Sequence, residues 1–241
     1  MGNILYLTFW VLVVYLFVSF FVVFLYVVKA INSAKSCKKY TRRLDARNIA
    51  FFGDSTGYGV GASNAKKTLP GLIGEANPDF SIINKCKSGA KIKDVIKVIQ
   101  KNDKVDVLIA CCGGIDILKL SKYTNIREDI HSLFEEMSNK SSNCIFISPV
   151  NLGFSLAFPW FLRIFYWKRS WDVGLMIKKE SRKFKNIQVI NNLLLKSVKK
   201  VPNYKNISSS DRIHPNDDGY AWTFSNLGKK IKIQGLNFKK S

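Results

Sequence analysis

Beyond residue 47, short apolar runs alternate with longer amphipathic stretches. The apolar runs have the length of strands and are continuously hydrophobic, which is typical of strands buried on both faces of a parallel sheet. We predict strands at residues 48–53, 80–86, 105–112, 143–150 and 187–193. The amphipathic stretches predict helices at residues 65–76, 91–101, 125–139, 172–185 and 219–230. This alternation indicates an α/β fold: a five-stranded parallel sheet in a three-layer α/β/α sandwich.

The first 47 residues follow a different pattern. Residues 4–28 contain no charged side chain and consist mostly of Leu, Val, Phe, Tyr and Trp. About 20 apolar residues span the hydrocarbon core of a bilayer, so this run predicts one transmembrane helix. A cleaved signal peptide would need a positively charged start and an apolar run of roughly 7–15 residues. The flank MGN carries no Lys or Arg and the run is longer, which favours a retained, single-pass membrane anchor.

The predicted organisation has four parts. They are a transmembrane helix at 4–28, a basic linker at 29–47, an α/β domain at 48–232 and a basic C-terminal tail at 233–241. Lys and Arg are absent before the helix and frequent directly after it, which predicts that the domain faces the cytoplasm. A periplasmic or extracellular domain stays open as the alternative, because large domains also cross membranes against the charge bias.

The cysteines fit a reducing compartment. Their number is odd and they show no CxxC spacing: Cys37, Cys86, Cys111, Cys112 and Cys144. The chain has only two histidines, so neither a disulfide framework nor a zinc site is predicted. We expect no metal and no organic cofactor.

A net charge of +21 shapes the partners that the surface attracts. Near a membrane, each Lys or Arg contributes about 1 kcal/mol of attraction to anionic lipid. The same charge attracts nucleic acid, but no nucleic-acid recognition motif accompanies it. Anionic lipid is therefore the expected partner, and nucleic acid is disfavoured. The sequence leaves the oligomeric state open.

Residues 151–171 interrupt the alternation with four Phe, three Trp and one Tyr. This segment is too short and too interrupted to span a bilayer, but too apolar for an ordinary loop. It covers a hydrophobic pocket, lies at the membrane interface, or belongs to the core. If it covers a pocket, Phe154, Phe158 and Trp160 are candidates for contact with a substrate.

The stretch FFGDSTGYG at 51–59 places Ser55 directly after the first predicted strand. GDSTG matches the nucleophile elbow G-x-S-x-G, but that elbow follows several earlier strands, and here only the apolar helix and linker come first. Gly57, Gly59 and Ala62 match a dinucleotide-binding pattern, which needs an acidic residue at the end of the second strand. That place holds lysines, so both interpretations are weak.

A third interpretation uses SDRIHPNDDGY at 210–220. Asp211 and His214 are three residues apart, so one short loop can bring the carboxylate to the imidazole. Ser55 ends the first strand and His214 follows the fifth, which places both at the carboxyl edge of the sheet. The pattern predicts a serine nucleophile with a histidine general base.

These blocks resemble the SGNH (GDSL) hydrolase family of serine esterases and lipases. FFGDSTGYG matches the first block, NKCKSGAKIKDV the second and DRIHPNDDGY the fifth. The resemblance implies a flavodoxin-like fold with strand order 2-1-3-4-5 and a triad of Ser55, His214 and Asp211. It also implies that Gly89 and the backbone of Ser55 form the oxyanion hole.

The third block departs from the family pattern. G-x-N-D is expected, but residues 113–116 read GGID, so Ile115 replaces the asparagine that would complete the oxyanion hole. Losing one such donor costs about 2.7–4 kcal/mol. The chain is therefore a slow esterase, an esterase with a substitute donor such as Asn151, or a catalytically weak domain that binds acyl groups or anionic lipid.

The prediction that combines these features is a membrane-anchored serine hydrolase of acyl esters. The membrane helix and the basic surface favour a lipid ester such as a lysophospholipid. An acetylated carbohydrate is the alternative substrate, especially for a domain outside the cytoplasm.

Overall fold

The computed structural model describes residues 2–195 and 203–238, and the predicted strands form one parallel sheet. Its order is β2-β1-β3-β4-β5, which confirms the order that the family resemblance implies. The strands are β1 (Asn48–Gly53), β2 (Ser81–Asn84), β3 (Val107–Cys111), β4 (Cys144–Ile147) and β5 (Ile187–Ile190). Most end before the predicted apolar runs do, because the last residues of those runs already belong to the loops at the carboxyl edge.

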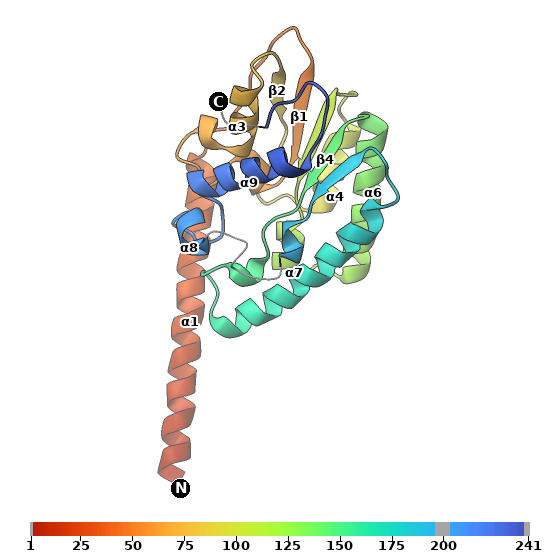
Figure 1. Cartoon of the computed structure of the whole chain (residues 1–241). Coiled ribbons are helices and arrows are strands. Elements are labelled where there is room, and N and C mark those ends of the chain that lie inside the picture. The colour runs from red at the N-terminus through yellow and green to blue at the C-terminus, as the bar shows by residue number, and fades with distance from the viewer. Residues whose placement is uncertain (1, 196–202, 239–241) are drawn as a thin grey trace.

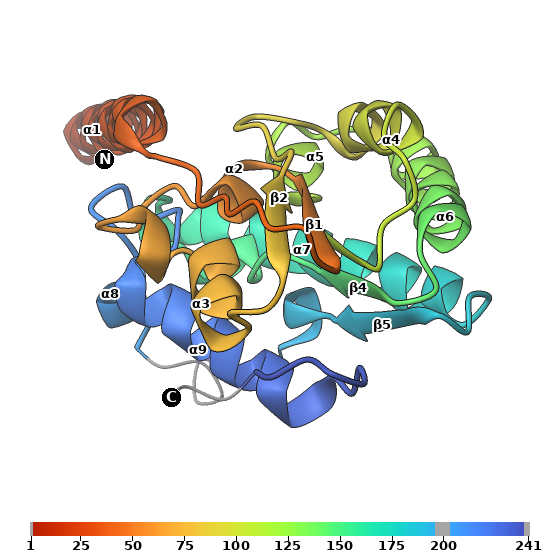
Figure 2. The ribbon, with the colours of Figure 1, turned by 90° about the horizontal axis from the view of Figure 1, so that it is seen from above.

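Helices cover both faces of the sheet, as predicted (Figure 2). One face carries α4 (Ile92–Gln100), α6 (Tyr123–Lys140) and α7 (Trp160–Ser181). The other carries α3 (Leu69–Ala76), which follows the short η1 (Ala65–Lys67), and α9 (Asp217–Lys230). Ala50 and Phe52 of β1 pack under the first group, and Ile49 and Phe51 pack under the second. A strand buried on both faces explains the continuous hydrophobicity of its sequence.

Short helices at the loops had no counterpart in the sequence pattern. They are α2 (Ser55–Tyr58), α5 (Gly114–Leu118), η2 (Leu152–Phe154), η3 (Asn192–Leu194) and α8 (Tyr204–Ile207). The predicted helix at 172–185 is the second half of α7, which begins at Trp160 after Pro159. Most of the aromatic segment at 151–171 is therefore helical.

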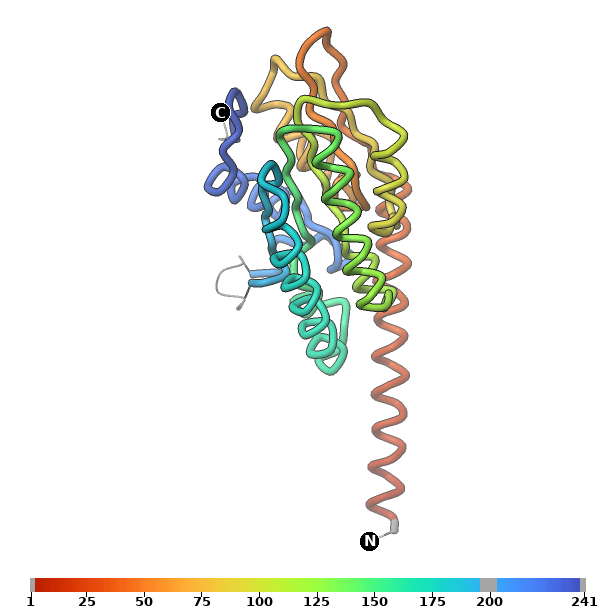
Figure 3. Tube along the Cα trace, turned by 90° about the vertical axis from the view of Figure 1, so that its right-hand side faces the viewer, coloured from red at the N-terminus to blue at the C-terminus, as the bar shows by residue number. Residues whose placement is uncertain are grey.

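Helix α1 (Gly2–Ser36) is continuous and extends away from the α/β domain (Figures 1 and 3). Among the described residues it alone is long and apolar enough to cross a membrane, and its most apolar window is not buried. The helix runs past residue 28, so the first part of the predicted linker at 29–47 is helical. The rest packs on the domain: Arg42 and Ile82 exchange two backbone hydrogen bonds, of 3.0 and 2.7 Å, at the edge of β2.

The predicted C-terminal tail also packs on the domain as far as it is described. Ile233 and Phe238 are buried in the same cluster as α9. Residues 239–241 of that tail lie outside the described residues.

Candidate active site

Ser55 is the first residue of α2, at the carboxyl end of β1. The preceding Gly53 lies so close to β3 that a Cβ there would be 2.0 Å from the carbonyl oxygen of Cys111. The side chain of Asp54 caps α2 by accepting a hydrogen bond from the N–H of Thr56 at 2.9 Å. The close approach of β1 to its neighbour β3 and the capped turn thus fix the direction of the serine side chain.

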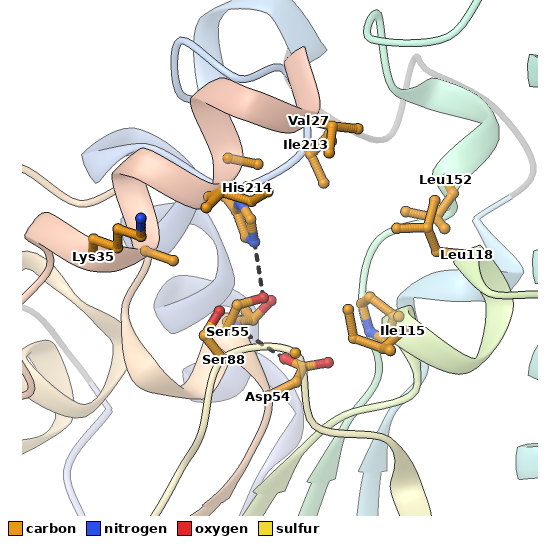
Figure 4. A pocket seen from close by; sticks show the side chains of 17 residues that line it. Val27, Lys35, Asp54, Ser55, Ser88, Ile115, Leu118, Leu152, Ile213 and His214 are labelled. Atoms are coloured by element: carbon orange, nitrogen blue, oxygen red, sulfur yellow. Dashed lines mark hydrogen bonds between the residues drawn. The ribbon is translucent and has the colours of Figure 1, made fainter. Parts of the chain in front are cut away.

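Ser55, His214 and Asp211 form a continuous hydrogen-bonded chain. Ser55 Oγ lies 2.8 Å from His214 Nε2, the contact drawn in Figure 4. His214 Nδ1 lies 2.7 Å from Asp211 Oδ2. The three side chains that the sequence proposed as a triad are therefore adjacent, with the imidazole between the hydroxyl and the carboxylate. In this arrangement the histidine is placed to accept the serine proton.

The loop between α8 and α9 holds Asp211 rigidly. Its Oδ1 accepts hydrogen bonds from the Ser209 hydroxyl at 2.7 Å, the Ile213 N–H at 2.8 Å and the His214 N–H at 2.9 Å. Burial alone would raise the pKa of Asp211, but the hydrogen bonds and charge of His214 outweigh it, and the pKa is lowered to about 2. Asp211 is therefore ionised at neutral pH. An ionised acceptor at Nδ1 favours the tautomer that leaves Nε2 free to accept a proton from Ser55.

Ser55 and Gly89, whose backbone N–H groups are the expected oxyanion donors, line the same cavity. Gly89 has φ +80°, and no atom lies within 4 Å of the place where a Cβ would be, so the backbone is open to the cavity. Among the hydrogen bonds of residues 2–195 and 203–238, none uses the N–H of Ser55 or Gly89. An oxyanion hole needs donors that stay unpaired until the charge develops, and this role of Ser55 and Gly89 stays a prediction.

The position at which the family pattern has an oxyanion-hole asparagine carries no polar side chain here. Ile115 lies in the first turn of α5 and lines the cavity opposite His214 (Figure 4). Asn151, the proposed substitute donor, is fully buried elsewhere. Its amide nitrogen donates to the carbonyl oxygens of Trp167 at 3.2 Å and Leu193 at 3.1 Å. With both amide hydrogens used in this way, Asn151 ties η2 to α7 and η3 instead of facing Ser55.

A largely apolar cavity of about 460 Å³ opens at Ser55. The domain contributes Ile115, Leu118, Leu152 and Ile213 to its walls. Helix α1 contributes the opposite side with Val27, Ala30, Ile31, Ala34 and Lys35. The sequence did not reveal these α1 residues as part of the site, because the whole helix is apolar and no face of it is marked by its pattern. Ser88 also lines the cavity and was not singled out from the sequence.

The aromatic residues proposed for the pocket lie away from this cavity. Phe154 packs with residues of α8, and the Phe158 ring lies 4.8 Å from the ring of Tyr166. Trp160 is 64% exposed at the start of α7. Of segment 151–171, Leu152 is the residue that reaches the cavity. The wall of this cavity is therefore largely aliphatic and comes mostly from other elements.

Helix α5, which carries Ile115, is held from both sides. The carboxylate of Asp116 accepts a hydrogen bond from the N–H of Ile92 in α4 at 2.9 Å. From α7, the buried Arg169 donates to the carbonyl oxygens of Ile117, at 3.1 Å, and Ser121. These contacts give Asp116 a structural role and fix one wall of the cavity.

Titratable groups in the described part of the chain lack the clustering that a metal centre needs. Among residues 2–195 and 203–238, no group of three or more His, Cys, Asp or Glu side chains has the arrangement of a metal site. Cys111 and Cys112 are buried in or next to β3, and burial raises their pKa. His131 lies 3.1 Å from Glu180 on the helical face, far along the chain from Ser55.

Comparisons with known proteins cover most of the α/β domain. The family described as GDSL-like Lipase/Acylhydrolase matches residues 49–227. No curated protein sequence matches the chain significantly.

Solved structures with a similar fold include a lipolytic G-D-S-L family protein from Veillonella parvula, with a TM-score of 0.59 and 18% identity over 77% of this chain and 100% of that one. A lipase/acylhydrolase from Enterococcus faecalis has a TM-score of 0.57 and 22% identity over 81% and 100%. An acetylxylan esterase from Geobacillus stearothermophilus has a TM-score of 0.56 and 17% identity over 80% and 97%. The family match over most of the domain shows that this chain belongs to the GDSL-like lipases/acylhydrolases, which are ester-cleaving hydrolases.

Proposed function

We propose that the protein is a membrane-anchored hydrolase of lipid acyl esters, with Ser55 as nucleophile, His214 as general base and Asp211 as the group that orients it. The observation that carries this proposal is the contact of 2.8 Å between Ser55 Oγ and His214 Nε2 at the floor of an apolar cavity. A nucleophile activated in this way attacks acyl carbons, and an apolar cavity favours acyl groups with hydrocarbon chains.

The reaction follows from the positions of these atoms. Ser55 Oγ bonds to the ester carbonyl carbon while its proton moves to His214 Nε2. The N–H groups of Ser55 and Gly89 donate to the oxyanion of the tetrahedral intermediate. The C–O bond to the alcohol then breaks, and the alcohol leaves with the proton from His214. Water repeats the sequence on the acyl-enzyme and releases a carboxylic acid and the free serine.

The cavity walls favour a lipid over a carbohydrate. Aliphatic side chains dominate them, whereas a sugar ring would need several hydrogen-bonding groups. Apart from His214, Lys35 is the basic residue among the described residues that line the cavity. An exposed ammonium group at the rim complements a phosphate headgroup, which favours a lysophospholipid among the lipid esters.

Two exposed apolar surfaces support a location at a membrane. One is α1, and the other is the first half of α7, where Trp160, Ile164 and Phe165 are 64%, 63% and 47% exposed. Figures 1 and 3 show that this end of α7 points in the same direction as the N-terminal end of α1. Aromatic side chains are enriched at membrane interfaces. We infer that this side of the domain lies against the bilayer and, from the basic residues after α1, that the domain is cytoplasmic.

A fluorophosphonate probe tests the proposed nucleophile. The full-length protein in phospholipid vesicles should be labelled, and Ser55→Ala should abolish labelling. Ser88→Ala is the matched control, since Ser88 lines the same cavity but makes no contact with His214. Absence of labelling in folded wild-type protein would contradict the enzyme and favour a lipid-binding domain.

Substrate class and topology need two further measurements. Hydrolysis of a lysophospholipid should exceed hydrolysis of an acetylated xylo-oligosaccharide, and the reverse order would favour the carbohydrate. Added protease should leave the domain intact in sealed, right-side-out vesicles if it faces the cytoplasm.

A further inference from the structure

We propose that α1 is a wall of the acyl-binding cavity as well as an anchor, so that a lipid substrate reaches Ser55 from the bilayer along this helix. The inference rests on the proposed function and adds the route of the substrate and the residues that select its chain.

One face of α1 borders the cavity. Val27, Ala30, Ile31, Ala34 and Lys35 line it, with the spacing i, i+3, i+4, i+7, i+8 of a single helix face. In Figure 4, Val27 and Lys35 lie on the side of His214, and Ile115 lies across the cavity. An acyl chain bound to Ser55 would therefore contact membrane-helix residues on one side and domain residues on the other.

The end of α1 is attached to the helix that carries the nucleophile. Cys37, the first residue after α1, donates its S–H to the carbonyl oxygen of Gly59 at 3.0 Å. The Lys39 ammonium lies 4.9 Å from the centre of the Tyr58 ring. Tyr58 and Gly59 end the short helix that Ser55 begins. Contacts between residues 37–39, directly after α1, and residues 58–59, at the end of α2, thus set the position of α1 relative to Ser55.

The length of α1 places the cavity in and just outside the headgroup region. With a rise of about 1.5 Å per residue, about 20 residues cross the hydrocarbon core of about 30 Å. Counted from Ile4, the core then ends near Phe24, and the first charged residue, Lys29, follows in the headgroup region. Val27 then lies about 5 Å beyond the core, within the headgroup region, and Ala34 lies about 15 Å beyond it. A lipid would therefore move outward along α1 by roughly 5–15 Å to bring its ester to the cavity. The ester would reach Ser55 while most of its acyl chain stays beside α1.

Small side chains make room on this face. Ala30 and Ala34 are one helical turn apart and both line the cavity. A large side chain at either place would fill the space between α1 and α5. This gives the inference a test that leaves the catalytic residues unchanged.

The test compares Ala30→Trp with Val28→Trp in the full-length protein in vesicles. Val28 lies two residues away, about 200° around the helix, and does not line the cavity. Hydrolysis of a lysophospholipid with a 16-carbon chain should fall about tenfold or more in Ala30→Trp. Hydrolysis of p-nitrophenyl acetate should fall much less than hydrolysis of the lysophospholipid, because its two-carbon acyl group needs little of the α1 wall. Val28→Trp should change neither rate.

A binding measurement separates failure of this inference from failure of the proposed chemistry. In Ser55→Ala protein, a lysophospholipid with a diazirine in its acyl chain should crosslink to residues 115–118 of α5. Ala30→Trp in that background should abolish this crosslink, and Val28→Trp should not. Equal effects of both tryptophans, or none, would overturn the inference even if Ser55 is the nucleophile. A selective loss in Ala30→Trp would support it even if wild-type protein hydrolyses no ester.

Discussion

Replacing Ile115 with asparagine should accelerate the enzyme. The side chain of Ile115 faces the cavity across from His214, at the position where the family pattern G-x-N-D has an amide (Figure 4). Ile92 of α4 donates to Asp116, and Arg169 of α7 donates to Ile117, so two neighbouring helices hold α5. The new amide should therefore occupy the place of Ile115 without moving the helix. The oxyanion would then have a third donor beside the N–H groups of Ser55 and Gly89.

The size of the effect follows from the donors already present. Removing one oxyanion donor from an adapted site costs about 2.7–4 kcal/mol. An amide introduced at Ile115 keeps rotational freedom in an open cavity, so we expect about half of this, or roughly 10–30-fold in kcat. The same change removes part of an apolar wall, which should weaken binding of a long acyl chain by about 1 kcal/mol and raise its KM about fivefold.

Steady-state hydrolysis of p-nitrophenyl butyrate and of a long-chain ester would give kcat and KM separately. Ile115→Ala controls for the loss of the side chain, and Leu118→Asn places the same amide one turn further along the cavity wall. Only Ile115→Asn should raise kcat. An unchanged kcat, or an equal rise in Ile115→Ala, would show that the oxyanion hole is already complete without a side-chain donor.

Three other predictions concern residues around the site. Burial raises the pKa of Asp54 to about 6, so its contribution to stability is complete below about pH 4 and is lost as pH rises through 6. The unfolding free energy of Asp54→Asn, measured in urea, should therefore rise by about 3 kcal/mol relative to that of wild type as the pH goes from 4 to 8. A difference in unfolding free energy that does not depend on pH would contradict this. Gly57→Ala places a Cβ 2.5 Å from Cys86 Sγ and should lower the unfolding free energy by about 1–3 kcal/mol; a double-mutant cycle with Cys86→Ala should recover part of the loss. Arg169→Met removes donors to the carbonyl oxygens at the end of α5 and should raise KM for long-chain esters, with fluorophosphonate labelling by a short probe as the control that the triad is intact.

The strands and the candidate triad were predictable for different reasons. Strands covered on both faces have sequences that are apolar at every position, so β1 to β5 stood out. Ser55 and His214 were expected to meet because the carboxyl ends of parallel strands share one edge of a sheet. The contact of 2.8 Å between them agrees with that expectation. Topology alone brought together residues that are far apart in sequence.

The parts that sequence reasoning missed lack a periodic signal. Helices α2, α5 and α8 have only four or five residues, too few for a helical pattern to repeat. The start of α7 was hidden because Arg163 and Lys168 interrupt an aromatic run. The sequence shows that Asn151 carries an amide, but it does not show that this amide donates to two backbone carbonyl groups. Composition shows which groups exist, but packing decides which of them remain free.

The same limit explains why α1 was taken for an anchor alone. Its hydrophobicity is uniform around the helix, so no face distinguishes a surface that meets lipid from one that meets the cavity. Ala30 and Ala34 acquire a role only because Cys37 and Lys39 hold the end of the helix against α2. If one wall of the site is a membrane helix, the domain from residue 48 onward keeps the chemistry but lacks that wall of its acyl-binding surface. Selectivity for long chains is then a property of the junction between membrane and domain, and it belongs to neither part alone.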